Sequence, residues 1–480
     1  MCHGTFDIVH PGHVRHLMYA REKADIMIAS LTCDAFITKA NFRPFVPEEL
    51  RAMNLAALEI VDYVIIDRNA TPLENLKYLQ PDYFAKGYEY FKDGLHPKTS
   101  EENQVIESYG GEIIFTPGDV VYSSSAFIEM APPRITAEKL ATLMEAEGVT
   151  FDALRDALAK FQDARVHVAG DTIVDSYSYG TLTGGTAKTP TFSIKHEHQV
   201  DFSGGAAVVS KHIRKAGATV KFSTVMGQDM LQGFVVNDLR AQGIECHVAV
   251  DHTRPTTQKI AYIAGGYRML KVDKLDNRPI SDKILEQLKA SLADSQVDAF
   301  VFSDFRHGIF NRQTIPQLTE CLPAEALKVA DSQVASRWGN ILDFAGFDLI
   351  TPNEREARFA LGDQDSVVRP LALELYTRAR CKFLIMKLGE RGIVAYRPNE
   401  ERAFLTVDSF VDKLVDAVGA GDALLAYATL ALVSTKSEVI ASILGSMAAA
   451  VACEKDGNNP VAPEDVLSKI DTVEKQVQYA

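Results

Sequence analysis

The sequence predicts an α/β protein made of two doubly wound parallel sheets, and three observations lead to this prediction. Short apolar, β-branched runs bounded by turn residues alternate with helical patterns, which favours parallel strands covered by helices on both faces. The chain of 480 residues is too long for one ordinary domain. The alternation is broken at Pro132-Pro133 and begins again near residue 164, so two separate units are expected.

The first unit is predicted to cover residues 1–131 and to be joined to the second by a charged linker over 132–150. Its strands are expected at residues 24–32, 61–67, 83–87 and 111–118, and its clearest helices at 13–24 and 47–60. Three residues precede Gly4, so either the strand before this glycine is unusually short or the true start codon lies upstream.

The second unit is predicted to cover residues 151–480 and to open with a strand at 164–171. Residues 189–205 alternate apolar and polar side chains, as an extended ribbon would. We expect this ribbon to form a small β lid that projects from the main sheet. Apolar patches and exposed sheet edges are usually covered, so the lid is also a candidate contact surface between two copies of the chain.

The composition narrows the range of partners. A hydrophobic content of 46% with 24% charged residues is typical of globular proteins, and the net charge of −14 argues against nucleic acid or an anionic membrane as partner. Local amides, lysines and arginines can still favour small anionic substrates inside a pocket. The six cysteines show no zinc-site spacing, and neither a signal peptide nor a long apolar run is present, so we expect a cytoplasmic protein with reduced thiols.

The motif GTFDIVHPGH, residues 4–13, predicts a nucleotide site. Gly4 and Gly12 allow the backbone to approach a triphosphate, and the helix that begins here offers free amides and a partial positive charge. His10 and His13 can donate hydrogen bonds to the phosphates as negative charge develops during reaction. Two isolated histidines are more often structural, but this spacing at a helix start favours catalysis.

The motif DAVGAGDA, residues 416–423, predicts a second phosphate site. The amides of Gly419, Ala420 and Gly421 should converge at a helix start and form an anion hole for a transferring phosphoryl group. Asp422 stands at the same point, where it can accept a proton from an attacking hydroxyl. Asp416 opens the loop and is a candidate for the cation side of the site.

The first 130 residues resemble the nucleotidyltransferase superfamily of cytidylyltransferases and sugar-phosphate adenylyltransferases. Beside the first motif, the matching positions are Lys39, Arg43-Pro44, Arg51, Lys86-Gly87 and the segment YSSSAFI at 122–128. The resemblance implies that Lys39 acts in catalysis with the two histidines and that Arg51 is a cationic clamp, although either could be an ordinary solvated charge. The other nucleotide-binding residues that it implies are Gly4, Thr5, Phe6, Asp7, Gly12, Lys86, Ser123, Ser124 and Ser125.

Residues 164–470 resemble the ribokinase-like (PfkB-type) sugar kinases. The matching segments are VAGDTIVD at 168–175, SGGAA at 203–207, FSDF at 302–305, TPNEREA at 351–357, KLGERG at 387–392 and DAVGAGDA. By resemblance, the residues that face the sugar are Asp171, Asp175, Gly204 and Gly205. Asn353 and Glu356 would lie near Mg²⁺ and the ATP phosphates, with the metal held largely through those phosphates.

The resemblance extends to the rest of the ATP site. Lys387, Gly389 and Gly392 would belong to its strand and loop, and Asn458 would approach the adenine. Lys259 is a spare cation on a lid-side strand that could hold a phosphate already present on the substrate. Such a lysine on an exposed strand is more often merely solvated.

Within that family, the chain resembles the heptose-phosphate kinases of ADP-heptose synthesis, a lipopolysaccharide precursor pathway. Those bifunctional enzymes carry both modules, usually with the kinase first, whereas this chain has the reverse order. Three local departures concern the substrate: Val208 replaces a usual Asn, Arg306-His307 replace a small residue and Lys, and Gln333 stands where a cation is common. A lost contact to a sugar hydroxyl could indicate a different sugar.

These resemblances predict a bifunctional enzyme. Its kinase would use Mg-ATP to phosphorylate the C1 hydroxyl of a sugar phosphate, with heptose 7-phosphate as the leading substrate. The other module would then join the 1-phosphate to a nucleotide, releasing pyrophosphate and giving ADP-heptose. The alternatives are a CTP-dependent enzyme acting on another sugar or polyol phosphate, and a nucleotide-binding regulator with one inactive module. Family resemblance also implies a homodimer through the lid of the kinase.

Overall fold

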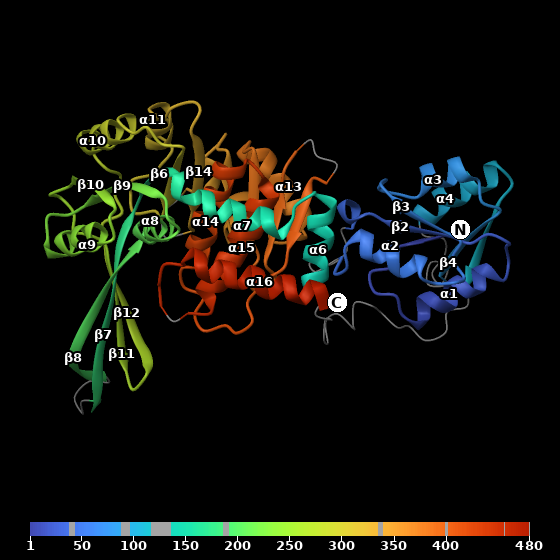
Figure 1. Cartoon of the computed structure of the whole chain (residues 1–480), viewed down its shortest axis with the longest axis horizontal. Helices are drawn as coiled ribbons and strands as arrows, with labels where there is room; N and C mark the ends of the chain where they lie inside the picture. Colours follow the sequence, from blue (N-terminus) through green and yellow to red (C-terminus); the bar gives the residue numbers. More distant parts are fainter. Residues whose placement is uncertain are drawn as a thin grey trace. The chain divides into compact units, whose positions relative to one another are not determined.

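The computed structural model describes residues 1–37, 44–87, 97–116, 136–185, 192–334, 339–398, 402–455 and 457–479. It forms two compact units, Met1–Leu143 and Met144–Ala480 (Figure 1). Among the described residues, no helix is both long and apolar enough to cross a membrane. Four predicted site residues, Lys39, Ser123, Ser124 and Ser125, lie outside the described ranges. The division into 1–131, 132–150 and 151–480 stays a prediction.

The described part of the first unit contains a parallel sheet with strand order β3-β2-β1-β4-β5. Its strands are β1 (Cys2–Gly4), β2 (Ile28–Thr32), β3 (Tyr63–Asp67), β4 (Tyr83–Gly87) and β5 (Glu112–Thr116). Its helices are α1 (Pro11–Arg21), η1 (Asp34–Phe36), α2 (Glu48–Ala56), α3 (Leu73–Leu79), α4 (Pro97–Ser108) and α6 (Thr136–Ala146). The predicted strands are present, and the described β1 has three residues.

The direction of winding reverses at β1. Cys2 pairs in parallel with Ala29 on one side and with Ala85 on the other, so β1 lies between β2 and β4. Ligands of doubly wound sheets bind at the carboxyl ends of the strands where the order reverses. The short first strand therefore places Gly4, and the loop that leads into α1, at this point of the sheet.

The described part of the second unit contains a larger sheet with order β10-β9-β6-β13-β14-β15-β16-β17-β18. Its strands are β6 (Arg165–Gly170), β9 (Thr219–Met226), β10 (Glu245–Val250), β13 (Ala299–Asp304), β14 (Leu327–Ser332), β15 (Leu349–Ile350), β16 (Phe383–Lys387), β17 (Ile393–Tyr396) and β18 (Phe404–Val407). The strands from β10 to β16 are parallel, and β17 and β18 are added antiparallel at one edge. The predicted fold class is confirmed, with this antiparallel edge as a refinement.

The helices of this unit follow in the order of the chain. They are α7 (Phe151–Ala159), η3 (Lys160–Asp163), α8 (Ala206–Lys215), α9 (Met230–Ala241), α10 (Asp282–Ala293), α11 (Thr314–Glu320), η4 (Ile341–Asp343), α12 (Glu354–Leu361), α13 (Val368–Ala379), η5 (Gly389–Arg391), α14 (Ala420–Thr435), α15 (Glu438–Cys453) and α16 (Pro463–Tyr479). Helix α14 is buried at every residue from Ala423 to Leu432. A helix that is apolar all round belongs in the interior, so its N-terminus is held firmly.

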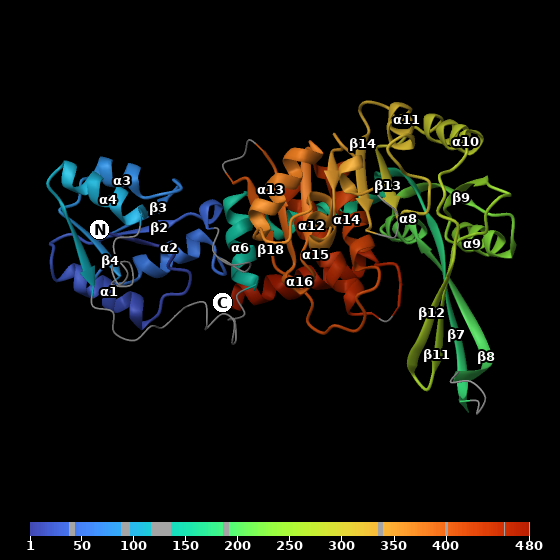
Figure 2. The same cartoon turned by 180° about the vertical axis from the view of Figure 1, so that it is seen from behind.

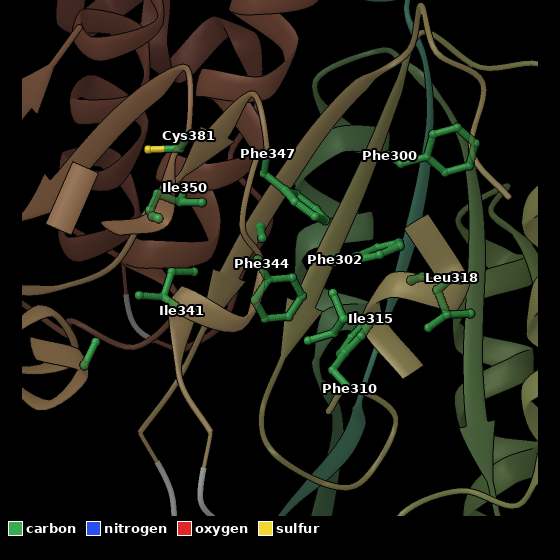
Figure 3. Packing of buried hydrophobic residues seen from close by; sticks show 14 of the residues in the cluster. Phe300, Phe302, Phe310, Ile315, Leu318, Ile341, Phe344, Phe347, Ile350 and Cys381 are labelled. Carbon is green, nitrogen blue, oxygen red and sulfur yellow. The ribbon is translucent and has the colours of Figure 1, made fainter. Parts of the chain in front are cut away.

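Aromatic side chains fill much of the core on one side of the larger sheet. Phe302 of β13 packs on Phe310, with ring centroids 5.0 Å apart, and Phe344 meets Phe347 edge-on at 5.5 Å (Figure 3). All four rings are buried. This packing fixes the end of β13, which carries the site residues that follow it.

Four further strands form the lid, in the order β12-β11-β7-β8. They are β7 (Thr172–Gly185), β8 (Phe192–Gly205), β11 (Gln258–Ala264) and β12 (Tyr267–Lys274), and they project from the body of the second unit (Figures 1 and 2). Strand β8 covers residues 192–205 of the ribbon predicted at 189–205, so the expected lid is confirmed. Its base continues from the central strand β6, which places the lid beside the carboxyl ends of the main strands.

Candidate active sites

His10 begins the first helix. Its backbone is extended, Pro11 occupies the first helical turn, and its Nδ1 accepts a hydrogen bond of 3.1 Å from the backbone N–H of Gly12. A neutral imidazole with an accepting Nδ1 carries its proton on Nε2. A Cβ at Gly12 would lie 2.9 Å from the His10 ring, so glycine is required there.

The two predicted catalytic histidines lie together. The ring of His13 stacks on that of His10 with centroids 3.9 Å apart. The centroid of the Phe6 ring lies 5.1 Å from that of His13. Phe6 adopts a positive φ of 48°, which is uncommon for a non-glycine residue. The local fold of residues 4–13 therefore holds both rings at the start of α1.

Asp7 and Arg51 support a loop from inside the unit. Asp7 accepts hydrogen bonds from the backbone N–H groups of Phe45 and Val46. Arg51 is 0% exposed and donates to the carbonyl oxygens of Val46, Thr5 and Thr32 and to the carboxylate of Asp34. The cationic clamp that the resemblance implies at Arg51 stays a prediction. In the structure the buried guanidinium connects α2 to Thr5, just after β1, and to Thr32, at the end of β2.

Further polar residues gather at the carboxyl ends of the strands in this unit. Lys86, at the end of β4, forms an ion pair with Glu102. His16 bonds to Thr116 at 2.9 Å, and His3 bonds to Ser30 at 2.9 Å. Burial lowers the pKa of both His3 and His16 to about 4, so both rings are neutral near pH 7. Our sequence prediction did not single out these two histidines, which lie within β1 and within α1.

In the second unit, the start of α14 forms a turn shaped by glycine. Gly419 has a φ of +79° and offers no side chain to cap the helix. A Cβ at Gly419 would lie 2.2 Å from Oδ1 of Asn458, and one at Gly421 would lie 3.3 Å from Nζ of Lys387. Asp416 closes the preceding loop by accepting from the N–H of Val418 at 3.0 Å. The turn thus joins the predicted anion hole to the predicted adenine and ATP residues.

Lys387 ties the end of β16 to a group of carboxylates. Its Nζ lies 2.8 Å from Oδ1 of Asp331, which also accepts from Thr351 at 2.8 Å. Burial acts to lower the pKa of Lys387, but Asp331, Glu356 and Asp422 raise it above its ordinary value. Asp331 was missed by sequence reasoning, because its link to Lys387 spans 56 residues and follows no local pattern.

Asp422 has the electrostatics of a proton acceptor. Burial raises the pKa of Asp422 to about 7, the charge of Asp331 adds to the rise, and Lys387 opposes it. Such a carboxyl can take up a proton near neutral pH. Because Asp175 also acts on its pKa, Asp422 and the base of the lid lie near the same space.

Asn353 and Glu356 form a reciprocal cap at the start of α12. The Asn353 side chain accepts from the Glu356 N–H at 2.8 Å, and Glu356 accepts from the Asn353 N–H at 2.7 Å. Burial raises the pKa of Glu356 to about 7, with Lys387 opposing the rise. In the described part of the chain, no three His, Cys, Asp or Glu side chains are grouped as a ready-made metal site. Glu356 and Asp331 fit a hard cation such as Mg²⁺ whose remaining ligands are phosphate oxygens.

The predicted sugar residues meet where the lid joins the sheet. Asp171 is buried and accepts from the backbone N–H groups of Phe305 and His307 at 2.9 and 3.1 Å. A Cβ at Gly205 would lie 2.4 Å from the carbonyl oxygen of Asp171, and one at Gly204 would lie 2.2 Å from Oδ2 of Asp175. Glycine is therefore required at 205, where the clash is with backbone, whereas a side chain at 204 would displace the Asp175 carboxylate.

Lys259 and Asp175 lie side by side on neighbouring strands of the lid. The two residues are directly paired between β11 and β7. Burial raises the pKa of Asp175, while Lys259 and Lys271 oppose this rise. Gly389 and Gly392, by contrast, shape the turn between β16 and β17, where a Cβ at Gly392 would lie 2.1 Å from the carbonyl of Val407.

The departures from the kinase pattern have a structural account at Arg306. This residue has a φ of +63°, is buried, and contacts Asp304 at 3.1 Å, Asp343 at 3.5 Å and Ser332 at 2.8 Å. Burial raises the pKa of Asp304 to about 7, and Arg306 opposes the rise. Arg306 therefore connects the ends of β13 and β14, and its guanidinium is engaged by protein groups. Val208 is buried within α8.

Comparison with known proteins covers both units. A family model described as pfkB family carbohydrate kinase matches residues 163–465, and one described as cytidylyltransferase-like matches residues 1–130. Bifunctional protein HldE of Desulfatibacillum aliphaticivorans is 26% identical over 337 residues, which is 68% of this chain and 66% of that protein. The HldE of Acidiphilium cryptum is 26% identical over 317 residues, or 64% and 63% of the two chains. The chain thus matches just under two thirds of the length of these relatives.

Solved structures share the fold of the second unit. Phosphofructokinase-2 from Escherichia coli, in its tetrameric inhibited form, superposes with a TM-score of 0.54 at 16% identity, covering 65% of this chain and 99% of that one. Arabidopsis thaliana ribokinase, complexed with ribose and ATP, gives 0.52 at 16% identity, covering 64% and 98%. These matches confirm the predicted fold of the second unit, and the two family models confirm the families predicted from the sequence motifs. Because the kinase model matches more than half of the chain, this protein belongs to the pfkB family of carbohydrate kinases.

Proposed function

We propose that the chain is a bifunctional enzyme of nucleotide-sugar synthesis. Its kinase would phosphorylate the C1 hydroxyl of a sugar phosphate with Mg-ATP, and its nucleotidyltransferase would convert the 1-phosphate into a nucleotide sugar. Heptose 7-phosphate is the leading kinase substrate and ADP-heptose the leading final product, supported by the similarity to the HldE proteins. The 7-phosphate has to be hydrolysed by a separate phosphatase between the two steps, so the nucleotidyltransferase would act on the sugar 1-phosphate. The six cysteines are all free, which suits an enzyme that works in the cytoplasm.

The observation that carries the kinase proposal is the grouping of Asp422 and Lys387 at the start of α14. The sugar hydroxyl oxygen would bond to the γ-phosphorus of ATP, the bond from that phosphorus to the bridging oxygen would break, and ADP would leave. Asp422, with a pKa of about 7, would take the hydroxyl proton. Lys387 and the amides of the glycine turn would stabilise the transferring group. Bound Mg²⁺ would supply charge neutralisation beside Glu356 and Asp331.

The nucleotidyl transfer would depend mostly on position and charge. An oxygen of the sugar 1-phosphate would bond to the α-phosphorus of the nucleotide, and pyrophosphate would leave. His10, which carries its proton on Nε2, and the adjacent His13 would donate to phosphate oxygens as their negative charge grows. Lys39 and Ser123–Ser125 keep their predicted phosphate-binding roles.

A panel experiment tests both steps. The full-length chain would be incubated with sugar phosphates and each of ATP, CTP, GTP and UTP, and the products read by mass spectrometry. We expect a sugar bisphosphate from the kinase with ATP, and a nucleotide sugar with pyrophosphate when a sugar 1-phosphate is supplied in the panel. Turnover of neither step would overturn the proposal and favour a nucleotide-binding regulator.

A second candidate keeps the reaction classes but uses CTP. It is favoured by the match of residues 1–130 to a cytidylyltransferase-like model. In that case the same panel would yield a CDP-sugar or CDP-polyol, and ATP would be consumed only in the kinase step.

A further inference from the structure

His307 is held rigidly in the loop that follows β13. The backbone N–H of His307 donates to the Asp171 carboxylate at 3.1 Å, and its backbone carbonyl accepts from the Arg254 guanidinium at 3.4 Å. The next residue, Gly308, has a φ of +105°, and a Cβ there would lie 2.1 Å from the carbonyl oxygen of Arg278. The backbone on both sides of His307 is therefore fixed, so the fold sets the place of its ring.

The ring of His307 is buried without hydrogen bonds from the described part of the chain. The residue is 9% exposed, and neither ring nitrogen reaches solvent or a partner among those residues. A neutral imidazole has one N–H donor and one acceptor. Leaving such a group unsatisfied in the interior is costly, so the ring is available to bond to a bound molecule.

The surroundings of the ring belong to the predicted sugar site. Burial lowers the pKa of His307, Lys259 adds to this, and Asp171 and Asp273 oppose it. Lys259 is paired in register with Asp175 on one side and with Asp273 on the other. His307 therefore lies next to Asp171, which follows β6, and within the electrostatic reach of Lys259 and Asp273 of the lid.

We propose that His307 determines substrate specificity by hydrogen bonding to a hydroxyl group of the acceptor sugar. A hydroxyl both donates and accepts, which matches a neutral ring better than an anionic group would. This inference rests on the proposed kinase function and extends it, because it names the residue that reads the sugar. It also gives a role to a position where the related kinases usually carry a lysine.

Two variants separate hydrogen bonding from packing. His307→Leu removes both polar ring atoms, whereas His307→Gln keeps a donor and an acceptor. His247→Leu, at an exposed position of β10, is the matched control. In the full-length chain we expect His307→Leu to lower kcat/KM for the sugar phosphate by about 10- to 100-fold. KM for ATP should stay unchanged, and His307→Gln should recover most of the loss.

Binding of the sugar phosphate without ATP, measured by calorimetry, provides a readout that does not need turnover. Wild type should bind more tightly than His307→Leu, and one monodeoxy analogue should lose affinity for wild type but not for this variant. Equal binding by wild type and His307→Leu would overturn the inference. Binding without phosphorylation in wild type would instead overturn the kinase proposal and leave the His307 comparison valid. Absence of any sugar binding would overturn both.

Discussion

The ammonium group of Lys387 lies 2.8 Å from Asp331, and its charge also acts on Glu356 and Asp422. One cation thus balances three carboxyl groups beside the glycine turn, and burial raises the pKa of two of them to about 7. Groups poised in this way can change protonation during a reaction near neutral pH. Activity should therefore depend on Asp422 as proton acceptor and on Lys387 as the residue that sets its pKa.

Asp422→Asn should lower the kcat of the kinase by about 10²- to 10⁴-fold, because an amide cannot accept the proton. Nucleotidyl transfer from a supplied sugar 1-phosphate should remain close to wild type. The variant should unfold at no lower temperature than wild type, since burial already disfavours the charged carboxylate. Separate assays of ADP and pyrophosphate release measure the two steps, with Asp294→Asn as an exposed control. A kinase rate within a few-fold of wild type would show that another group is the base.

Lys387→Met should move the pH dependence of the kinase upward. In wild type, kcat should rise with pH as Asp422 loses its proton near pH 7. Lys387 opposes the elevation of that pKa, so its removal raises the pKa further and the rise in kcat moves to higher pH. The maximal rate should also fall. Rates measured from about pH 5.5 to 9 test this, and an unchanged or lower midpoint would contradict the assigned role of Lys387.

Secondary-structure elements show what local sequence patterns can predict in this chain. The apolar runs at 61–67 and 83–87 correspond to β3 and β4, and the alternating ribbon corresponds to β8. The glycines of the motif DAVGAGDA predicted the start of helix α14. These features depend on neighbouring residues, so spacing and composition suffice to predict them.

Long-range partners set the roles that the sequence did not predict. The sequence predicts Arg51 as a cationic clamp but not its burial, which comes from its partners Thr5, just after β1, and Thr32, at the end of β2. Asp331 becomes part of the kinase site only through Lys387, and His307 only through Asp171. No local period carries such information, because it arises when strand ends meet at one edge of a sheet.

The turn before α14 yields a prediction at the scale of the element. Gly419→Ala should reduce kinase activity strongly, because a Cβ would collide with Asn458 and the positive φ costs about 1–2 kcal/mol for a non-glycine residue. Gly346→Ala is a matched control, since Gly346 has the same φ of +79° and no atom within 4 Å of an added Cβ. The unfolding temperature should fall comparably in both variants, because alanine is equally strained at the positive φ of both positions. A loss of activity that is equal in both would indicate general destabilisation.

The whole molecule consists of two units, each with its own sheet and its own phosphate-binding helix start. Separate cores imply that a lesion in one site leaves the other site folded. His13→Ala should therefore stop pyrophosphate release while ADP release by the kinase stays at the wild-type rate. Met18→Ala, an exposed change on the same helix, serves as the control. A parallel fall in kinase activity would indicate a shared site or misfolding of the whole chain.

Assembly is the remaining property at this scale, and the lid is its candidate surface. Phe202 and Val200 on β8 are 46% and 38% exposed. They pair directly with Asp175 and Tyr177 of the neighbouring strand β7. Burying apolar side chains of this size against a second lid would stabilise an isologous dimer, because the same patch is used twice. We therefore predict that the full-length chain is a homodimer joined through its lids.

Light scattering of the full-length chain at micromolar concentration should give twice the mass of the chain. The double substitution Val200→Lys with Phe202→Lys should yield a monomer, because two lysines on the patch would meet two more across the two-fold axis. Tyr78→Lys, which changes an 88% exposed aromatic residue in the first unit, should remain dimeric. A monomeric wild type would remove the lid contact and leave the lid to cover only the sugar site of its own chain. A dimer that survives the double substitution would place the contact on another surface.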